Sequence, residues 1–139
     1  MTVSTDSERI TPEDPVVRIM RVPVASVPAE RTAREVAEEL AADEVGAVLV
    51  DGPHGPIGLV SERDVVTLLG TGGDPDVVQA VDLMDGELVW VGARESIATA
   101  AMRMRHTGVR HLPVKRSDGV IVGMVSVRDL LTVLAGTER

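Results

Sequence analysis

Cysteine is absent from this chain of 139 residues, and of the aromatic residues there is one Trp and no Phe or Tyr. Without cysteine the chain forms no disulfide bond and has no thiolate nucleophile, so we expect a reducing, cytoplasmic location. Without aromatic platforms on which bases stack, single-stranded nucleic acid is not an expected ligand. The hydrophobic core must therefore consist of aliphatic residues and Met.

An excess of basic residues is also missing, since the formal net charge is −8. Nucleic-acid binding calls for a basic face, so no nucleic-acid partner is expected. The apolar runs are short and the first ten residues are largely polar. We therefore expect neither a signal peptide nor a membrane span.

Patterns of residues that hold metals or perform catalysis are lacking as well. His54 lies in an expected turn, and His106 and His111 are five residues apart without a Cys or a His-x3-His spacing. Solvated or hydrogen-bonded histidines are thus favoured over a metal site. No Walker-type Gly-Lys-Ser and no glycine-framed nucleophilic Ser is present. The sequence predicts no enzyme and no metal.

An internal repeat is the main positive feature of the chain. Residues 58 to 69 recur at 123 to 134, and seven of the twelve pairs at this offset of 65 are identical. We call Gly58–Asp64 the first corner and Gly123–Asp129 the second corner. Half of this chain is too short to bury much core alone, so we expect the two copies to form one compact body.

Each copy is predicted to run strand, helix, strand, strand, helix, which is an α+β arrangement. Residues 1–11 are expected to be a flexible arm, 12–70 repeat 1, 71–135 repeat 2 and 136–139 a tail. Asp14-Pro15 and its counterpart Asp74-Pro75 are each expected to open a short helix. The expected strands are residues 24–27, 47–50 and 56–60 in repeat 1, and 88–91, 109–114 and 120–125 in repeat 2.

Helix caps support these boundaries. Thr32 with Glu35 predicts a capping box, and Ser96 predicts the equivalent helix start in repeat 2. We expect these two helices to end at Gly46 and Gly108. Closing helices are expected at residues 62–69 and 127–135, with a linker at 70–73 between the repeats.

The two corners allow two interpretations. Ser61 and Ser126 stand at N-cap positions, and an Asp three residues later completes a capping box in each corner. Alternatively, the helix N-terminus, the hydroxyl and the adjacent Arg bind an anion while the carboxylate accepts ribose hydroxyls. A cap has no use for Arg, so its repetition favours the nucleotide interpretation.

These motifs resemble a known family. The doubled Gly-hydrophobic-hydrophobic-Ser-x-Arg-Asp corner and the Gly108-Val109-Arg110-His111-Leu112-Pro113 segment resemble a tandem pair of cystathionine beta-synthase (CBS) domains. The resemblance covers roughly residues 12 to 135. It implies a Bateman module, in which two repeats pack with pseudo-twofold symmetry around inter-repeat clefts. In relatives these clefts bind AMP, ADP, ATP or S-adenosylmethionine, and the modules commonly form homodimers.

The resemblance also implies roles for particular residues. The ribose would be held by Asp64 and Asp129, and the phosphate by Ser61 and Ser126 with help from Arg63, Arg128 and Arg110. The segment that lines the adenine would be Val22 and Pro23, or Gly86 and Glu87. The first copy departs from the pattern, with Leu49 in place of Pro113 and Gly46 in place of Arg110. We therefore expect the second corner to be the principal site.

Two functional hypotheses follow from the sequence. The first is a sensor of an adenosine-containing ligand, which acts as a homodimer on an unidentified protein target. The second is a scaffold that uses the CBS pair only for dimerisation or docking. The repeated Ser, Arg and Asp favour the sensor, and a nucleotide-cleaving enzyme ranks well below both.

Overall fold

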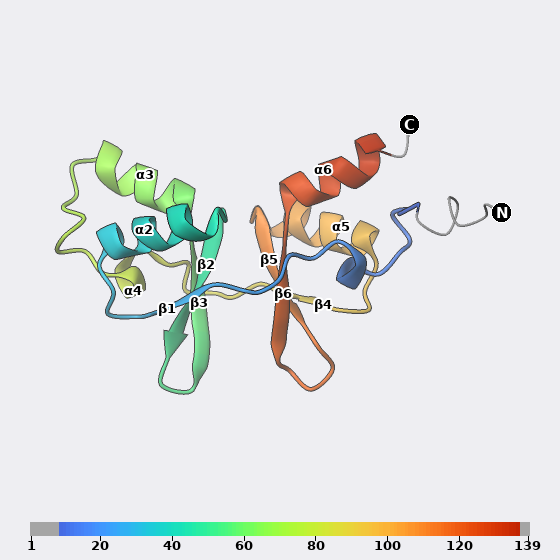
Figure 1. Ribbon diagram of the computed structural model, residues 1–139, viewed down its shortest axis with the longest axis horizontal. Helices are drawn as coiled ribbons and strands as arrows, with labels where there is room; N and C mark the ends of the chain where they lie inside the picture. Colours follow the sequence, from blue (N-terminus) through green and yellow to red (C-terminus); the bar gives the residue numbers. More distant parts are fainter. Residues whose placement is uncertain (1–8, 137–139) are drawn as a thin grey trace. The chain divides into compact units, whose positions relative to one another are not determined.

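The chain folds into two compact units, as the computed structural model shows for residues 9–136 (Figure 1). Unit 2 comprises Val24–Leu88, and unit 1 combines the residues up to Pro23 with those from Val89 onward. The predicted tail and most of the predicted arm lie outside the described residues. Each unit contains helices and one mixed sheet, which confirms the α+β class.

Unit 2 is built on a three-stranded sheet in the order β1-β2-β3. β1 runs parallel to β2, and β2 and β3 form an antiparallel hairpin. The elements of unit 2 are β1 Ser26–Pro28, α2 Ala33–Asp43, β2 Ala47–Gly52, β3 Gly55–Ser61, α3 Glu62–Gly70 and α4 Ala80–Leu83. Its core contains only aliphatic residues: Val27, Val36, Leu40, Val48, Val50, Val60, Val65 and Ala80.

Unit 1 repeats this plan with the sheet order β4-β5-β6. β4 is parallel to β5, and β5 and β6 form the hairpin. The elements are the 3₁₀ helix η1 Val16–Arg18, β4 Val91–Gly92, α5 Ile97–Thr107, β5 His111–Lys115, β6 Ile121–Ser126 and α6 Val127–Gly136. The core is again aliphatic with one Met: Val16, Val91, Ile97, Ala100, Met104, Leu112, Val114, Val125, Leu130 and Val133.

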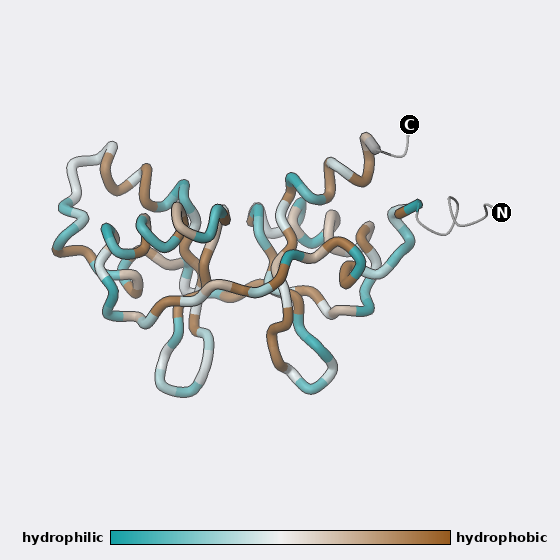
Figure 2. Tube along the Cα trace, viewed as in Figure 1, coloured by the Kyte–Doolittle hydropathy of each residue, from teal (hydrophilic) through white to brown (hydrophobic). Residues whose placement is uncertain are grey.

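The sequence explains why the core lies between the helices and the central strands. β2 begins with the apolar run Ala47–Val50 and β5 contains the apolar run Leu112–Val114, and the residues of both runs are buried. The tip of the β2–β3 hairpin, by contrast, is drawn in hydrophilic colours (Figure 2). Among the helices within residues 9–136, none combines the length and apolar character needed to cross a membrane.

The predicted order of strands and helices is confirmed, but several boundaries differ. α2 ends at Asp43 because Glu44 adopts the left-handed conformation, so Gly46 is not the helix end. Gly108 is the left-handed C-cap of α5, as predicted. Pro15 is the N-cap of η1 rather than its first residue. The first strand of each copy begins two or three residues later than expected.

The compact units do not coincide with the predicted repeats 12–70 and 71–135. Backbone hydrogen bonds explain why the start of repeat 1 belongs to unit 1. Val16 N donates to Glu95 O at 2.9 Å, and Ile97 N donates to Asp14 O at 2.8 Å. The segment that precedes β1 in the sequence is thus bound to the sheet and helices of repeat 2.

Candidate ligand-binding corners

Both corners form the predicted caps. In the first corner, Asp64 Oδ2 accepts hydrogen bonds from Ser61 N at 2.7 Å and Ser61 Oγ at 3.0 Å, and Ser61 Oγ accepts from Asp64 N at 3.3 Å. In the second corner the same three bonds between Ser126 and Asp129 measure 2.9, 3.0 and 3.2 Å. Each cap uses Oδ2 of the carboxylate and leaves Oδ1 for another partner.

The two corners differ at Oδ1. Asp129 Oδ1 accepts a hydrogen bond of 3.0 Å from Arg21 Nε, and this ion pair joins a carboxylate that is 9% exposed to a guanidinium that is 67% exposed. Asp64 Oδ1, in contrast, has no partner among residues 9–136. The first corner therefore offers more unused acceptor capacity than the second.

A close contact between Met and Gly places Arg21 at the second corner. Met20 packs over Gly123, so the next residue, Arg21, pairs with Met124: Arg21 N donates to Met124 O at 2.8 Å, and Met124 N donates to Arg21 O at 3.1 Å. Met124 lies two residues before Ser126 in β6. The guanidinium of Arg21 thereby reaches the carboxylate of Asp129.

The same arrangement places Asp85 beside the first corner. A Cβ at Gly58 would lie 2.5 Å from Met84 Sδ, and Asp85 N donates to Leu59 O at 3.3 Å. Leu59 lies two residues before Ser61, as Met124 does before Ser126. Asp85 is thus the structural counterpart of Arg21, with the opposite charge.

The helix that follows each corner has one unused N–H in its first turn. Glu62 N donates to Gly46 O, and Val127 N donates to Arg110 O, both at 2.9 Å. The second N–H of each helix belongs to Arg63 or Arg128, and no acceptor for it lies among the described residues. Free N–H groups at a helix start favour an anion.

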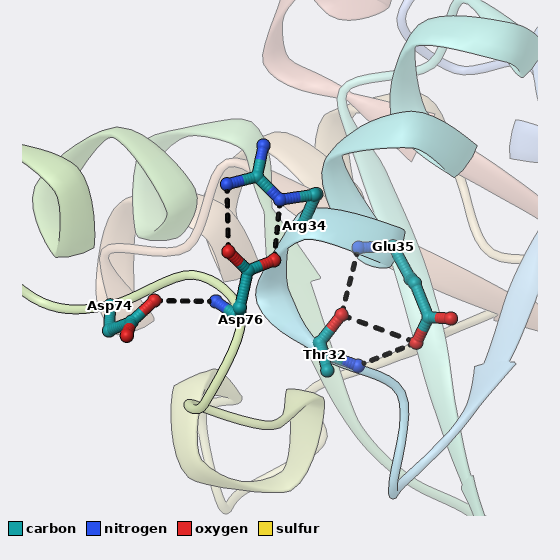
Figure 3. A network of polar contacts seen from close by, with 5 residues as sticks. All are labelled: Thr32, Arg34, Glu35, Asp74 and Asp76. Carbon is teal, nitrogen blue, oxygen red and sulfur yellow. Dashed lines mark hydrogen bonds and ion pairs between the residues drawn. The ribbon is translucent and has the colours of Figure 1, made fainter.

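The start of α2 shows what a purely structural cap looks like in this chain. Thr32 and Glu35 form a capping box, and the backbone bond from Thr32 lowers the pKa of the Glu35 carboxyl (Figure 3). Here the next two N–H groups are taken: Ala33 N donates to Val78 O at 2.8 Å, and Arg34 N to Pro75 O at 2.9 Å.

The side chain of Arg34 is occupied as well. Its Nε and Nη2 atoms bind the two carboxylate oxygens of Asp76 at 2.5 and 3.0 Å, and Asp76 N in turn donates to Asp74 Oδ1 at 2.9 Å (Figure 3). This helix start leaves neither an N–H nor an arginine for a ligand.

The structure sorts the sequence-predicted residues into two sets. Unit 1 contains Val22, Pro23, Arg110, Ser126, Arg128 and Asp129, and unit 2 contains Ser61, Arg63, Asp64, Gly86 and Glu87. Val22 and Pro23 follow Arg21, and Gly86 and Glu87 follow Asp85; all four are exposed. The three predicted arginines are exposed, with Arg110 contributing its backbone carbonyl to the second corner.

Sequence reasoning missed Arg21 and Asp85. The available indication was their position, since each directly follows one of the paired methionines Met20 and Met84. Within residues 9–136, no group of three or more His, Cys, Asp or Glu side chains is arranged to hold a metal ion.

Comparison with known proteins identifies the family. The CBS domain matches twice, over residues 11–71 and 80–136, and the chain belongs to the CBS domain family as a tandem pair. An uncharacterized protein of Methanopyrus kandleri is 33% identical over 104 residues, which cover 73% of this chain and 53% of that protein. The chain spans about half to three fifths of the length of the curated relatives it matches.

Solved structures show the same fold. A CBS domain protein from Pyrobaculum aerophilum complexed with AMP is 30% identical, with a TM-score of 0.76 over 88% of this chain and 98% of that one. A CBS domain pair in complex with 5′-methylthioadenosine and S-adenosyl-L-methionine is 18% identical, with a TM-score of 0.79 over 91% and 99% of the two chains. The first of these structures shows a relative of this chain in complex with AMP, and the likeness to the second shows the fold.

Proposed function

We propose that this chain is a regulatory CBS pair that binds an adenosine-containing ligand, such as AMP, ADP, ATP or S-adenosylmethionine, at its two corners. The observation that carries the proposal is the shared construction of these corners. In each, a Ser–Asp cap fixes a carboxylate, and the following helix leaves one N–H and one exposed arginine without a partner in the described chain. The cap at Thr32 lacks both features.

The proposed roles follow from this chemistry. Asp64 and Asp129 accept hydrogen bonds from the ribose hydroxyls, while Ser61 and Ser126 lie where the phosphate meets the helix start. The cations that bind the phosphate are Arg63 at the first corner, and Arg128 with Arg110 at the second. The exposed segments Val22–Pro23 and Gly86–Glu87 line the adenine. The bound relative from Pyrobaculum aerophilum supports AMP as one such ligand.

The module is proposed to act as a cytoplasmic homodimer that regulates a protein target and catalyses no reaction. Apolar side chains on the two closing helices support association. Val66 and Leu69 of α3 are 65% and 54% exposed, and Leu131 and Leu134 at the equivalent positions of α6 are 58% and 52% exposed. Repeated apolar positions on a surface favour burial against a second copy.

Isothermal titration calorimetry tests the proposed function. Wild type and the double variant Asp64→Ala/Asp129→Ala are titrated with AMP, ADP, ATP and S-adenosylmethionine. Saturable heat with wild type and none with the double variant is expected, and Thr32→Ala, which removes a cap outside both corners, should bind like wild type. No heat from wild type with any of the four compounds would leave the dimerisation or docking scaffold as the function.

A further inference from the structure

The two corners carry opposite charge although their backbones are equivalent. The difference is concentrated at four pairs of aligned positions, where unit 1 has a positive or neutral residue and unit 2 a negative or neutral one. These pairs are Arg21 and Asp85, Pro23 and Glu87, Arg110 and Gly46, and Val127 and Glu62. The Arg and Asp of the motif itself are the same in both corners.

Backbone hydrogen bonds join three of these four pairs to their corners, and Pro23 and Glu87 lie two residues after Arg21 and Asp85. Arg21 and Asp85 pair with the last strand two residues before the capping Ser. Arg110 and Gly46 provide the carbonyl that accepts the first N–H of the closing helix, and Val127 and Glu62 are that first residue. The charges therefore differ where a ligand at the corner would meet them.

The second corner suits an anionic group. Arg21 gives its Nε hydrogen to Asp129, while its two terminal nitrogens have no partner among the described residues. A guanidinium has five N–H donors, so Arg21 can hold Asp129 and a phosphate at once. Together with Arg110 and Arg128, it gives this corner three arginines against one carboxylate.

The first corner suits a ligand without a phosphate. Asp64 uses only Oδ2 in its cap, so Oδ1 can accept hydrogen bonds from the two ribose hydroxyls. The neighbouring carboxylates of Glu62, Asp85 and Glu87 outnumber Arg63. Negative charge at these positions opposes a phosphate and favours a neutral or positively charged nucleoside.

We infer that the two corners select ligands by charge, with Arg21 and Asp85 as the residues that determine this specificity. The second corner takes a phosphorylated nucleoside, and the first takes an unphosphorylated nucleoside, neutral or cationic. This inference rests on the proposed function, because it assumes that adenosine-containing ligands bind at the corners. A single chain would then report on the two ligand classes separately.

Calorimetry on chains with one intact corner tests the inference, with AMP and adenosine as probes. Asp64→Asn, which leaves the second corner intact, should bind AMP at least about tenfold more tightly than adenosine, as expected for charge-assisted hydrogen bonds. Asp129→Asn, which leaves the first corner intact, should bind adenosine more tightly than AMP. S-adenosylmethionine should behave like adenosine.

Substitution of the two proposed specificity residues then reverses the preference. Adding Arg21→Gln to Asp64→Asn should lower AMP affinity about tenfold and leave adenosine affinity within about twofold. Adding Asp85→Arg to Asp129→Asn should raise AMP affinity. Arg116→Gln is the matched control. Arg116 directly follows Lys115, which pairs with Ile121 at one end of the β5–β6 hairpin, whereas Ser126 of the second corner pairs with His111 at the other end. Arg116→Gln should therefore change neither ratio.

The possible failures are distinguishable. If both single-corner chains bind AMP and adenosine in the same ratio, or if Arg21→Gln leaves that ratio unchanged, selection by charge is wrong while ligand binding stands. If wild type binds none of these three compounds and neither ADP nor ATP, the proposed function itself is wrong. Arg21 is exposed, so Arg21→Gln should still fold, which thermal unfolding checks directly.

Discussion

Gly58 lies so close to Met84 that a Cβ at residue 58 would be 2.5 Å from the Met84 sulfur and 2.7 Å from the backbone oxygen of Asp85. Gly123 has the equivalent contact with Met20. The glycine that opens each corner motif is therefore explained by the segment packed over it. This packing aligns residue 85 with Leu59 and residue 21 with Met124.

Gly58→Ala is expected to lower the free energy of unfolding by about 1–3 kcal/mol, the usual cost of overpacking. The cost should exceed that of Gly123→Ala, because the three atoms nearest to a Cβ at residue 123 all belong to the Met20 side chain, whereas those nearest to a Cβ at residue 58 include the backbone oxygen of Asp85. Urea denaturation measures both. Gly70→Ala is the control, since a Cβ there has no heavy atom within 4 Å. Equal stability of Gly58→Ala and Gly70→Ala would contradict the packing explanation.

The element order and the caps were predictable because they depend on residues close in sequence. The Ser-x-x-Asp spacing predicted both corner caps, and Thr32 with Glu35 predicted the start of α2. The expected end of α2 at Gly46 is wrong because a non-glycine residue, Glu44, takes the left-handed conformation and ends the helix at Asp43. The left-handed conformation is unfavourable for a residue other than glycine, and local composition does not indicate which residue adopts it.

The composition of the units and the pair Arg21–Asp129 were not predictable from local patterns. These two residues are 108 positions apart, and their contact depends on the first segment of repeat 1 packing in unit 1. Hydrophobic periodicity reports neighbours along the chain and carries no information on such a distant pairing. The alignment of Met20 with Met84 indicates the equivalent positions, but only the structure places Arg21, the residue after Met20, at the second corner.

The exposed apolar positions on the closing helices predict a homodimer in solution. Light scattering at tens of micromolar should give twice the chain mass of 14.7 kDa. Val66→Glu and Leu131→Glu should shift the mass towards monomer, because a buried carboxylate without a partner is unfavourable. Val77→Glu changes an equally exposed valine outside these helices, at 70% exposure, and should remain dimeric. A monomeric wild type would rule the dimer out.

The pair Glu95–Arg103 predicts a pH dependence of stability. The hydrogen bonds from Arg103 Nη1 at 2.8 Å and Nη2 at 3.0 Å, followed by that from Gly92 N, lower the pKa of the Glu95 carboxyl. Because the folded-state pKa is depressed, the stabilisation is present above the ordinary value of 4.5 and is lost as the pH falls through the lower folded value.

Glu95→Gln should therefore reduce the free energy of unfolding at pH 7, and its difference from wild type should shrink progressively as the pH falls below 4.5, as measured by thermal and urea unfolding from pH 7 to pH 3. The side chains of the pair are 38% and 32% exposed, so solvent screening limits the effect to about 1 kcal/mol or less. Glu30→Gln, at an exposed position without an ion pair in the described chain, is the control for the loss of one carboxylate. A constant difference between wild type and Glu95→Gln from pH 7 to pH 3 would contradict this assignment.

The last prediction separates ligand binding from capping at the corners, with the cap at Thr32 as internal reference. Thr32→Ala and Ser126→Ala each remove an N-cap and should cost about 0.5–2 kcal/mol without ligand. AMP at a hundredfold excess over Kd should add about 2.7 kcal/mol to wild type and to Thr32→Ala, since the ligand binds only the folded state. The double variant Asp64→Ala/Asp129→Ala should gain no stability from AMP.

Arg128→Ala, which removes no cap, should lose AMP stabilisation and keep its stability without ligand, because only the phosphate contact is removed. Thermal unfolding with and without AMP measures all five chains, and equal AMP increments in wild type and the double variant would reduce both corners to structural caps.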